Sequence, residues 1–317
     1  MDFRRRFIGV VLFSALIVGF ESVAVEGALK IADLSIFLVS AMPSFIGGII
    51  LLGAFPQGSK RFIKGLGRRG WSGMLVLCVL VAAGVLMWFD AVGRIGASKE
   101  AILGGGSSEV LFIVILSALL LSERLRRWEV LGSFLVVAGV FLVLANVESM
   151  SFSLELGEIE AILSSLILAF SVVLTTMLLK THDLTALSGL ELFLSGVFMV
   201  VFGVAFGLVK WPDATGWAIL LLMGLFPAVG LWTYNAGLPR IGASLTSVLF
   251  ALNGIMTVGV QLLVLFFVPD ADLMLPQNLG LAVTGGGVAF VGVYLLNREV
   301  GRKEKLSRVA GGAEGEI

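Results

Sequence analysis

Ten runs of about 20 mainly apolar residues account for most of this sequence. Because an α-helix rises about 1.5 Å per residue, a run of about 20 residues is long enough to cross the hydrocarbon core of a bilayer. The runs are continuous and do not alternate in hydropathy, which favours helices over the strands of a membrane barrel. The sequence therefore predicts an all-α integral membrane protein with ten transmembrane helices. The runs cover residues 7–26, 32–55, 71–92, 97–120, 128–147, 157–179, 186–209, 215–237, 241–267 and 277–297.

The composition excludes a soluble fold and several kinds of site. The chain is 58% hydrophobic and 14% charged, whereas a soluble domain carries about 25% charged residues. Its single cysteine, Cys78, and single histidine, His182, offer no intrachain disulfide and no Cys- or His-based metal site. We expect no metal and no cofactor. The sequence has no ATP-binding motif, so any active transport must draw on an ion gradient.

The distribution of basic residues predicts how the chain is oriented in the membrane. With the N-terminus in the cytoplasm, all but four of the 22 lysines and arginines lie in cytoplasmic loops and termini. The exceptions are Lys30, Arg94, Lys99 and Lys210. We therefore expect both termini in the cytoplasm and a location in the plasma membrane or a bacterial inner membrane. The basic loop 56–70 suits anionic lipid headgroups, and nothing in it calls for nucleic acid.

A five-residue sequence occurs twice. Residues 94–98 read Arg-Ile-Gly-Ala-Ser, and the same five residues recur at 240–244. At the same spacing Trp88 corresponds to Tyr234, Glu100 to Thr246 and Ser107 to Asn253. Matches in register over roughly fifty residues indicate an internal duplication, which is typical of transporters built from repeats.

The duplication predicts the domain organisation. Five spans per half is an odd number, so the second half enters the membrane from the opposite side and the repeats are inverted. We expect a first repeat at 1–147, an external linker at 148–156, a second repeat at 157–298 and a disordered cytoplasmic tail at 299–317.

The order and spacing of these features resemble those of the drug/metabolite transporter superfamily, specifically its EamA-type members. Each half ends in a Leu-Gly…Gly-Val helix. Glu123 stands in Leu-Ser-Glu-Arg-Leu after the fourth span, and Glu109 lies where many members have a mid-helix Glu-Pro pair. Val110 replaces that proline, and Pro43 and Glu26 lie near positions that are commonly basic. The resemblance implies a carrier of small metabolites, often an exporter, that works by alternating access.

Carboxylates inside the predicted spans are the first candidate site residues, because each costs about 2.5–3.5 kcal/mol in mid-membrane unless it faces a cavity or a partner. Glu109 lies deepest, about 18 Å from the outer end of its span. With Glu21, Glu26 and Glu100 it is predicted to bind protons or a cationic group. For the last three the alternative is solvation at the interface, and Glu100 could instead pair with Lys99. For Glu191, near a span end, contact with lipid headgroups is the favoured interpretation.

Polar residues on the fourth and ninth spans form a second candidate set. Thr246, Asn253 and Thr257 share one helix face, and Ser107 repeats part of it. The alternative for the two threonines is a hydrogen bond to their own helix. Ser107 and Glu109 point about 200° apart on a regular helix, so both reach one cavity only if Gly104–Gly106 breaks the helix. Close packing is the alternative for these glycines.

Aromatic residues at duplicated positions form a third set. Trp88, Trp232 and Tyr234 lie near predicted span ends on opposite sides of the membrane. They belong either to the aromatic belts of the two interfaces or to a pair of gates that stack on a substrate.

Together these features favour a secondary transporter for a small molecule such as an amino acid, amine, nucleoside or drug-like compound. It would act as an exporter, with possible proton coupling through the buried carboxylates, and as a monomer or homodimer. A multi-span membrane enzyme and a passive channel are the alternatives. The enzyme is disfavoured because the chain lacks a His pair, an activated Cys and a Gly-x-Ser-x-Gly nucleophile motif.

Overall fold

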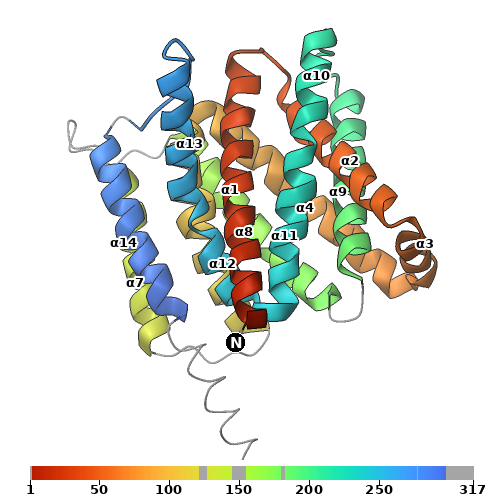
Figure 1. Cartoon of the computed structure of the whole chain (residues 1–317), viewed down its shortest axis with the longest axis horizontal. Coiled ribbons are helices and arrows are strands. Elements are labelled where there is room, and N and C mark those ends of the chain that lie inside the picture. Colours follow the sequence, from red (N-terminus) through yellow and green to blue (C-terminus); the bar gives the residue numbers. More distant parts are fainter. Residues whose placement is uncertain (1, 121–126, 145–154, 180–182, 277, 298–317) are drawn as a thin grey trace, which may run out of the picture.

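The computed structural model describes residues 2–120, 127–144, 155–179, 183–276 and 278–297, and the regular structure within these residues is helical (Figure 1). Long apolar helices stand side by side, with α1 near the middle of the view and α7 and α14 at one edge. The elements are α1 (Asp2–Lys30), α2 (Ile36–Ala54), α3 (Pro56–Gly65), α4 (Arg68–Ile95), α5 (Ala97–Leu103), the π-helix η1 (Gly104–Ser108), α6 (Glu109–Leu120), α7 (Arg127–Leu144), α8 (Leu156–Leu178), α9 (Leu184–Ala205), α10 (Ala214–Met223), α11 (Leu225–Ile241), α12 (Ala243–Phe250), α13 (Asn253–Phe267) and α14 (Leu279–Asn297).

Each predicted apolar run contains at least one helix. Among the described residues, 6 helices are long and apolar enough to cross a membrane, and α13 and the first part of α14 are shorter apolar helices. The all-helical membrane class is thus confirmed, while the number of ten crossings stays a prediction. Glu123, most of the linker 148–156 and the tail 299–317 lie outside the described residues.

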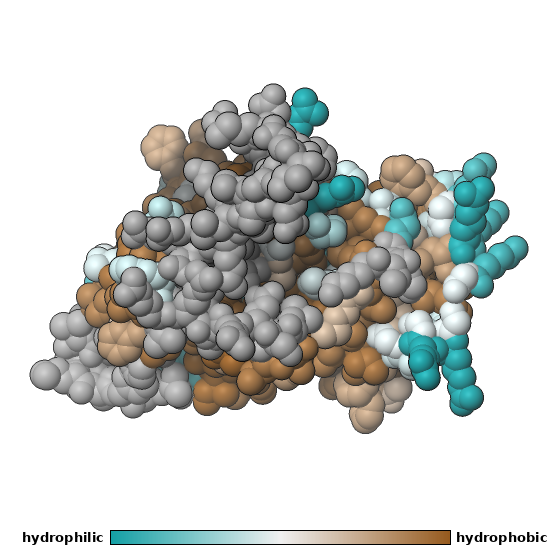
Figure 2. All heavy atoms as spheres, turned by 90° about the horizontal axis from the view of Figure 1, so that it is seen from below, coloured by the Kyte–Doolittle hydropathy of each residue, from teal (hydrophilic) through white to brown (hydrophobic). Residues whose placement is uncertain are grey.

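The predicted loop 56–70 differs from expectation, because it contains the helix α3. Pro56 opens this helix, a position at which its missing N–H costs no hydrogen bond. The basic side chains of the segment are exposed, as expected for a surface near headgroups: Lys60, Arg61, Lys64, Arg68 and Arg69. Figure 2 shows hydrophilic side chains gathered on the side where α3 lies, next to a largely hydrophobic flank.

Large apolar side chains point outward along the helices. Phe266, Leu119 and Leu222 are each more than two thirds exposed. Water would oppose so large an exposed apolar surface, whereas lipid accepts it without cost. The described surface therefore supports burial of the helices in a bilayer.

The duplication is visible in the arrangement of the helices. Shifting α4 by the spacing of the repeated motif places it on α10 and α11, and shifting α5 places it on α12. The main packing pairs exchange in the same way, since α1 packs on α11 while α8, the counterpart of α1, packs on α4. α2 packs on its counterpart α9, and α7 packs on α14. Corresponding helices of the two halves therefore swap places in the packing, as expected for two repeats related by approximate two-fold symmetry.

The fourth and ninth runs are interrupted at corresponding places. The first run passes through η1, and the second turns at Ala251 between α12 and α13. A Cβ on Gly106 would lie 3.2 Å from the carbonyl oxygen of Ala251, and one on Gly254 would lie 3.1 Å from that of Ala101. The glycines therefore allow the two interrupted helices to touch backbone to backbone. The sequence offered either a helix break at Gly104–Gly106 or close packing of these glycines. The structure shows a helix that is widened to a π-helix without being broken, and its glycines pack closely.

Candidate functional site

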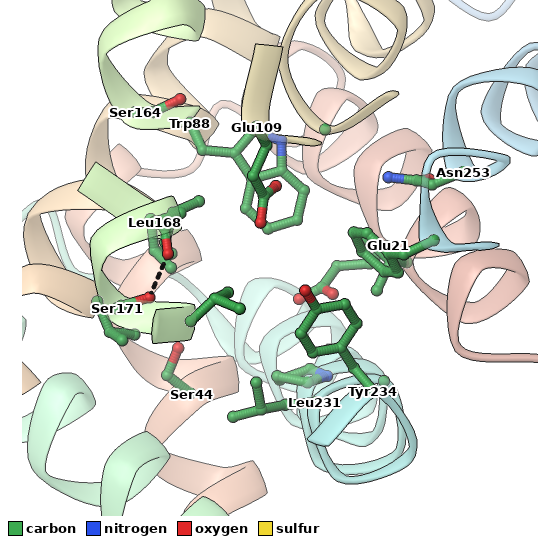
Figure 3. Close-up of a pocket in the computed structure, with 18 of the residues that line it drawn as sticks. Glu21, Ser44, Trp88, Glu109, Ser164, Leu168, Ser171, Leu231, Tyr234 and Asn253 are labelled. Carbon is green, nitrogen blue, oxygen red and sulfur yellow. Dashed lines mark hydrogen bonds between the residues drawn. The ribbon is translucent and has the colours of Figure 1, made fainter. Parts of the chain in front are cut away.

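A cavity of about 140 Å³ lies between the two halves. The first half lines it from α1, α2, α4, α5, η1 and α6, and the second half from α8, α9, α11, α12 and α13. Three buried apolar clusters of the helix bundle contribute to its wall, one through Val81 and Val172, one through Phe89 and one through Leu192. Figure 3 shows acidic, hydroxyl and aromatic groups pointing into this space.

The repeated motif positions one wall of the cavity. Gly96 has φ 84° and ψ 154°, a conformation that is essentially restricted to glycine. It ends α4 and lets α5 begin at the next residue. Trp88 on α4 and Glu100 on α5 are thereby folded against each other, and the Trp88 Nε1–H donates a hydrogen bond of 2.6 Å to Glu100 Oε2. Both side chains line the cavity.

The second copy of the motif builds the opposite wall with different chemistry. Gly242 adopts φ 87° and ψ 154° and joins α11 to α12 in the same way. Tyr234, the counterpart of Trp88, lines the cavity, and its ring packs edge-on against Phe250 with centroids 4.9 Å apart. Its buried hydroxyl has no hydrogen-bond partner in the described part of the chain. Thr246, the counterpart of Glu100, does not line the cavity, because its hydroxyl donates to the Gly242 carbonyl at 2.7 Å.

The two interrupted helices present different repeat positions to the cavity. In the first half Glu109 lines the cavity, while the Ser107 hydroxyl donates to the carbonyls of Ile102 at 2.5 Å and Leu103 at 3.0 Å. In the second half Asn253, the counterpart of Ser107, lines the cavity, and Ile255, the counterpart of Glu109, is 52% exposed on the outside. The predicted conflict between Ser107 and Glu109 is therefore real, and the acid occupies the cavity.

Four carboxyl groups line the cavity: Glu21, Glu100, Glu109 and Glu191. Glu21 is 5% exposed and Glu191 only 2%. The expected contact of Glu191 with headgroups is wrong, because α9 packs between α2, α4 and α11 and buries this side chain. The alternative of solvation at the membrane interface is also wrong for Glu21 and Glu100, because both are buried at the cavity.

Glu26 is fully buried but lies away from the cavity. Its carboxylate accepts hydrogen bonds from the backbone N–H groups of Ala97 at 2.9 Å and Met274 at 2.5 Å, and from Gln261 Nε2 at 3.1 Å. Lys30 Nζ lies 3.4 Å from it. The expected substrate or proton role is therefore not supported by its position, since it joins α1 to the start of α5, to α13 and to the segment before α14.

Two further predicted residues, Thr257 and Trp232, make hydrogen bonds to neighbouring groups and do not line the cavity. The Thr257 hydroxyl donates to the backbone carbonyl and the side-chain Oδ1 of Asn253, each at 2.9 Å, so only Asn253 reaches the cavity. Trp232 Nε1 donates to Thr185 Oγ1 at 3.0 Å and does not line the cavity. Trp88 and Tyr234 line one cavity together, so neither the pair of interfacial belts nor a gate at each membrane face describes their placement.

The expected pairing of Lys99 with Glu100 is wrong. Lys99 Nζ lies 2.6 Å from Glu158 Oε1 on α8. On the same side of the molecule Arg94 pairs with Asp90 at 2.8 Å and with Glu160 at 3.0 Å. Adjacent helical residues point about 100° apart, which directs Lys99 outward and Glu100 inward.

Sequence reasoning missed several polar lining residues. They are Ser44, Ser164, Ser165, Ser171, Thr175 and Asn235. Small hydroxyl residues occur throughout membrane helices and bond to their own backbone, so their types carry little signal. A usable signal was present on α8, where four of these residues recur at helical spacing on one face. Among the described residues, no group of three His, Cys, Asp or Glu side chains is close enough to hold a metal ion.

Comparisons with known proteins agree with this architecture. The sequence matches the EamA-like transporter family twice, over residues 6–145 and 155–298. No curated protein matches it. Among 27 solved protein chains that match, one crystal structure is similar with a TM-score of 0.61 and 21% sequence identity, covering 90% of this chain and 98% of the other. That similarity concerns the fold.

Proposed function

Because this chain belongs to the EamA-like transporter family, we propose that it exports a small metabolite across the membrane by alternating access. The members of this family are transporters and not enzymes. The observation that carries the proposal is the cavity between the two halves, with carboxyl groups from both halves on its wall. Substrate sites of repeat-built transporters lie at this kind of interface near the midplane.

The proposal includes ten crossings, two inverted repeats and both termini in the cytoplasm. The exchange of packing partners between α1–α11 and α8–α4 supports the inversion, and the distribution of basic residues supports the orientation. Reporter fusions after residue 150 and after residue 317 test it. We expect the two reporters on opposite faces of the membrane, and reporters on the same face would rule out the inverted arrangement.

Coupling to protons is proposed for the cavity carboxyl groups. A carboxylate surrounded by apolar chain must either hold a proton or meet a cation, so its state can change as the cavity opens to one side or the other. Glu109 is the leading candidate, since the structure gives its side chain no hydrogen bond or basic partner among the described residues and places it on the cavity wall.

The test uses purified protein in vesicles with an imposed pH gradient and a panel of amines, amino acids and nucleosides. We expect gradient-driven movement of at least one compound, and loss of that response in Glu109→Gln. Asp272→Asn is the matched control, because Asp272 is exposed and outside the cavity. Gradient-driven transport that is unchanged in Glu109→Gln would remove Glu109 from coupling. Ionic conductance far above carrier turnover would instead identify a channel.

A further inference from the structure

The acidic groups of the cavity have no basic partner among the lining residues that the structure describes. The cavity wall carries four carboxyl groups, and the described lining residues include no Lys, Arg or His. The two buried acids outside the cavity do have basic partners: Glu26 has Lys30 at 3.4 Å, and Glu158 has Lys99 at 2.6 Å. An unpaired buried carboxylate is costly. A cationic ligand would supply the missing positive charge.

The acids converge on a common space. Figure 3 shows Glu21 from α1, Glu109 from α6 and the hydroxyl of Tyr234 from α11 pointing toward the same part of the cavity. Glu191 Oε2 and the Tyr234 hydroxyl are buried with no hydrogen-bond partner among the residues that the structure describes. Buried polar atoms are normally paired, so these groups lack a partner that a bound molecule can provide.

The other polar groups of the wall are mainly hydrogen-bond acceptors. The hydroxyls of Ser44, Ser165 and Ser171 donate their protons to carbonyls of their own helices at 2.9, 2.7 and 2.7 Å, which leaves their oxygens free to accept. The Trp88 indole and the Asn235 amide already donate, to Glu100 and to Ser188. Asn253 is the exception, because its Oδ1 accepts from Thr257 and its amide nitrogen faces the cavity. An acceptor-rich cavity selects a ligand that brings N–H donors. A primary ammonium group brings three.

The rest of the wall is apolar and aromatic. Trp88, Phe89, Tyr234 and Phe250 lie on it with aliphatic side chains such as Val85. Aromatic faces attract cations and also stack on rings. The cavity therefore combines a place for a positive charge with a place for a hydrophobic group.

From these contacts we propose that the substrate is an amphipathic primary amine, protonated at neutral pH and carrying an aromatic or similarly apolar group. Its ammonium group donates to Glu21, Glu109 and the serine oxygens, and its ring lies against the aromatic wall. This inference rests on the proposed function and names the substrate class of the same cavity.

The test compares ligands of one shape and different charge on the purified full-length protein. The probes are 2-phenylethylamine, the neutral 3-phenylpropionamide, the anionic 3-phenylpropionate and the quaternary phenylethyltrimethylammonium, with binding measured by calorimetry at pH 7.5. We expect the primary amine to bind at least tenfold more tightly than the amide and the acid. The quaternary ion should bind more weakly than the primary amine, because it has charge but no N–H donor. Amide or acid binding as tight as the amine would overturn the proposal.

Variants locate the site. Glu21→Gln and Glu109→Gln should each weaken binding of 2-phenylethylamine about tenfold, while Asp272→Asn should leave it unchanged. Replacing an acid on the cavity wall by its neutral isostere should not unfold the protein, and thermal melting of the same samples checks this. If both folded glutamine variants bind the amine as the unmodified protein does, the assignment of the ammonium group to these acids is wrong.

Counterflow in vesicles separates this inference from the proposed function. Tight amine binding without any transport would contradict the transporter and leave the ligand class standing. Transport of neutral or anionic aromatic compounds in preference to the amine would support the transporter and overturn the ligand class. Exchange of labelled 2-phenylethylamine across the membrane supports both.

Discussion

The indole nitrogen of Trp88 donates a hydrogen bond of 2.6 Å to the carboxylate of Glu100 across the turn at Gly96. This contact fixes an acid and an aromatic ring at one wall of the cavity. Its counterparts in the second half, Tyr234 and Thr246, do not repeat it, because Thr246 bonds to its own helix. The two copies of the motif therefore present different side chains to the same space, an indole and an acid from the first copy and a phenol from the second.

The first prediction concerns this contact. Trp88→Phe keeps an aromatic ring and removes the donor, and a buried acceptor left without its partner costs about 1–3 kcal/mol. We expect thermal unfolding in detergent to show a loss of stability of that order, together with reduced transport. Trp232→Phe is the control, because it loses a bond to the neutral hydroxyl of Thr185 outside the cavity. Equal transport by the two variants would show that the Trp88 contact has no role in the site.

The second prediction is a pH dependence outside the membrane helices. Asp33 accepts a hydrogen bond from Lys210, joining the α1–α2 loop to the α9–α10 loop. This bond and the positive charge of Lys210 hold the pKa of Asp33 below its ordinary value of 3.8. A lowered pKa in the folded state contributes stability above the ordinary value, and this contribution is lost as the pH falls through the lowered value.

Comparison of the unmodified protein with Asp33→Asn measures that contribution. Asn tolerates the positive φ of 46° at this position, so the substitution tests charge and not backbone strain. We expect a small advantage in Tm for the unmodified protein at pH 7 that declines as the pH falls below 3.8 and is gone below the lowered pKa of Asp33. It should also disappear at high salt, which screens exposed pairs. An advantage that stays constant with pH would mean that ionisation of Asp33 does not contribute.

The helices and their pairing follow from the sequence for simple reasons. Apolar runs of span length must satisfy their backbone hydrogen bonds internally in lipid, which leaves helix as the only option for separate segments. The repeated motif predicts matching turns because a glycine stands at the same place in each copy, and Gly96 and Gly242 adopt nearly the same φ and ψ.

The site was harder to predict from the sequence than the helices, because the burial of a side chain depends on which helices become neighbours. Glu191 is close to the end of its run, yet three neighbouring helices bury it. Trp88 was placed near a span end, but α4 continues to Ile95 and leaves the indole within the bundle. Glu26 and Glu21 looked alike in sequence. Only the fold shows that backbone N–H groups surround Glu26 and that Glu21 faces the cavity.

The third prediction separates the structural role of Glu26 from a role in the site. In Glu26→Gln one carboxylate oxygen becomes an amide NH₂, which must face the N–H groups of Ala97 or Met274. We expect a loss of stability of about 1.5–3 kcal/mol with unchanged affinity of the folded protein for 2-phenylethylamine. Lys30→Met, which removes only the pair at 3.4 Å, should cost less than about 1 kcal/mol. Weaker binding by a fully stable Glu26→Gln would place Glu26 in the binding site.

The last prediction uses the two copies of the motif as controls for each other. Alanine at Gly96 or Gly242 must adopt φ near 85°, which costs about 1–3 kcal/mol for a residue with a Cβ. At Gly96 the new Cβ also meets the Met274 carbonyl, whereas at Gly242 no atom of the described residues lies within 4 Å. Both variants should therefore melt below the unmodified protein, with Gly96→Ala the lower. Gly259→Ala, in a helix with open space around it, should be neutral or slightly stabilising. Equal melting of the Gly96 and Gly242 variants would mean that the contact with Met274 relaxes freely, and that backbone strain alone sets the cost of closing these turns.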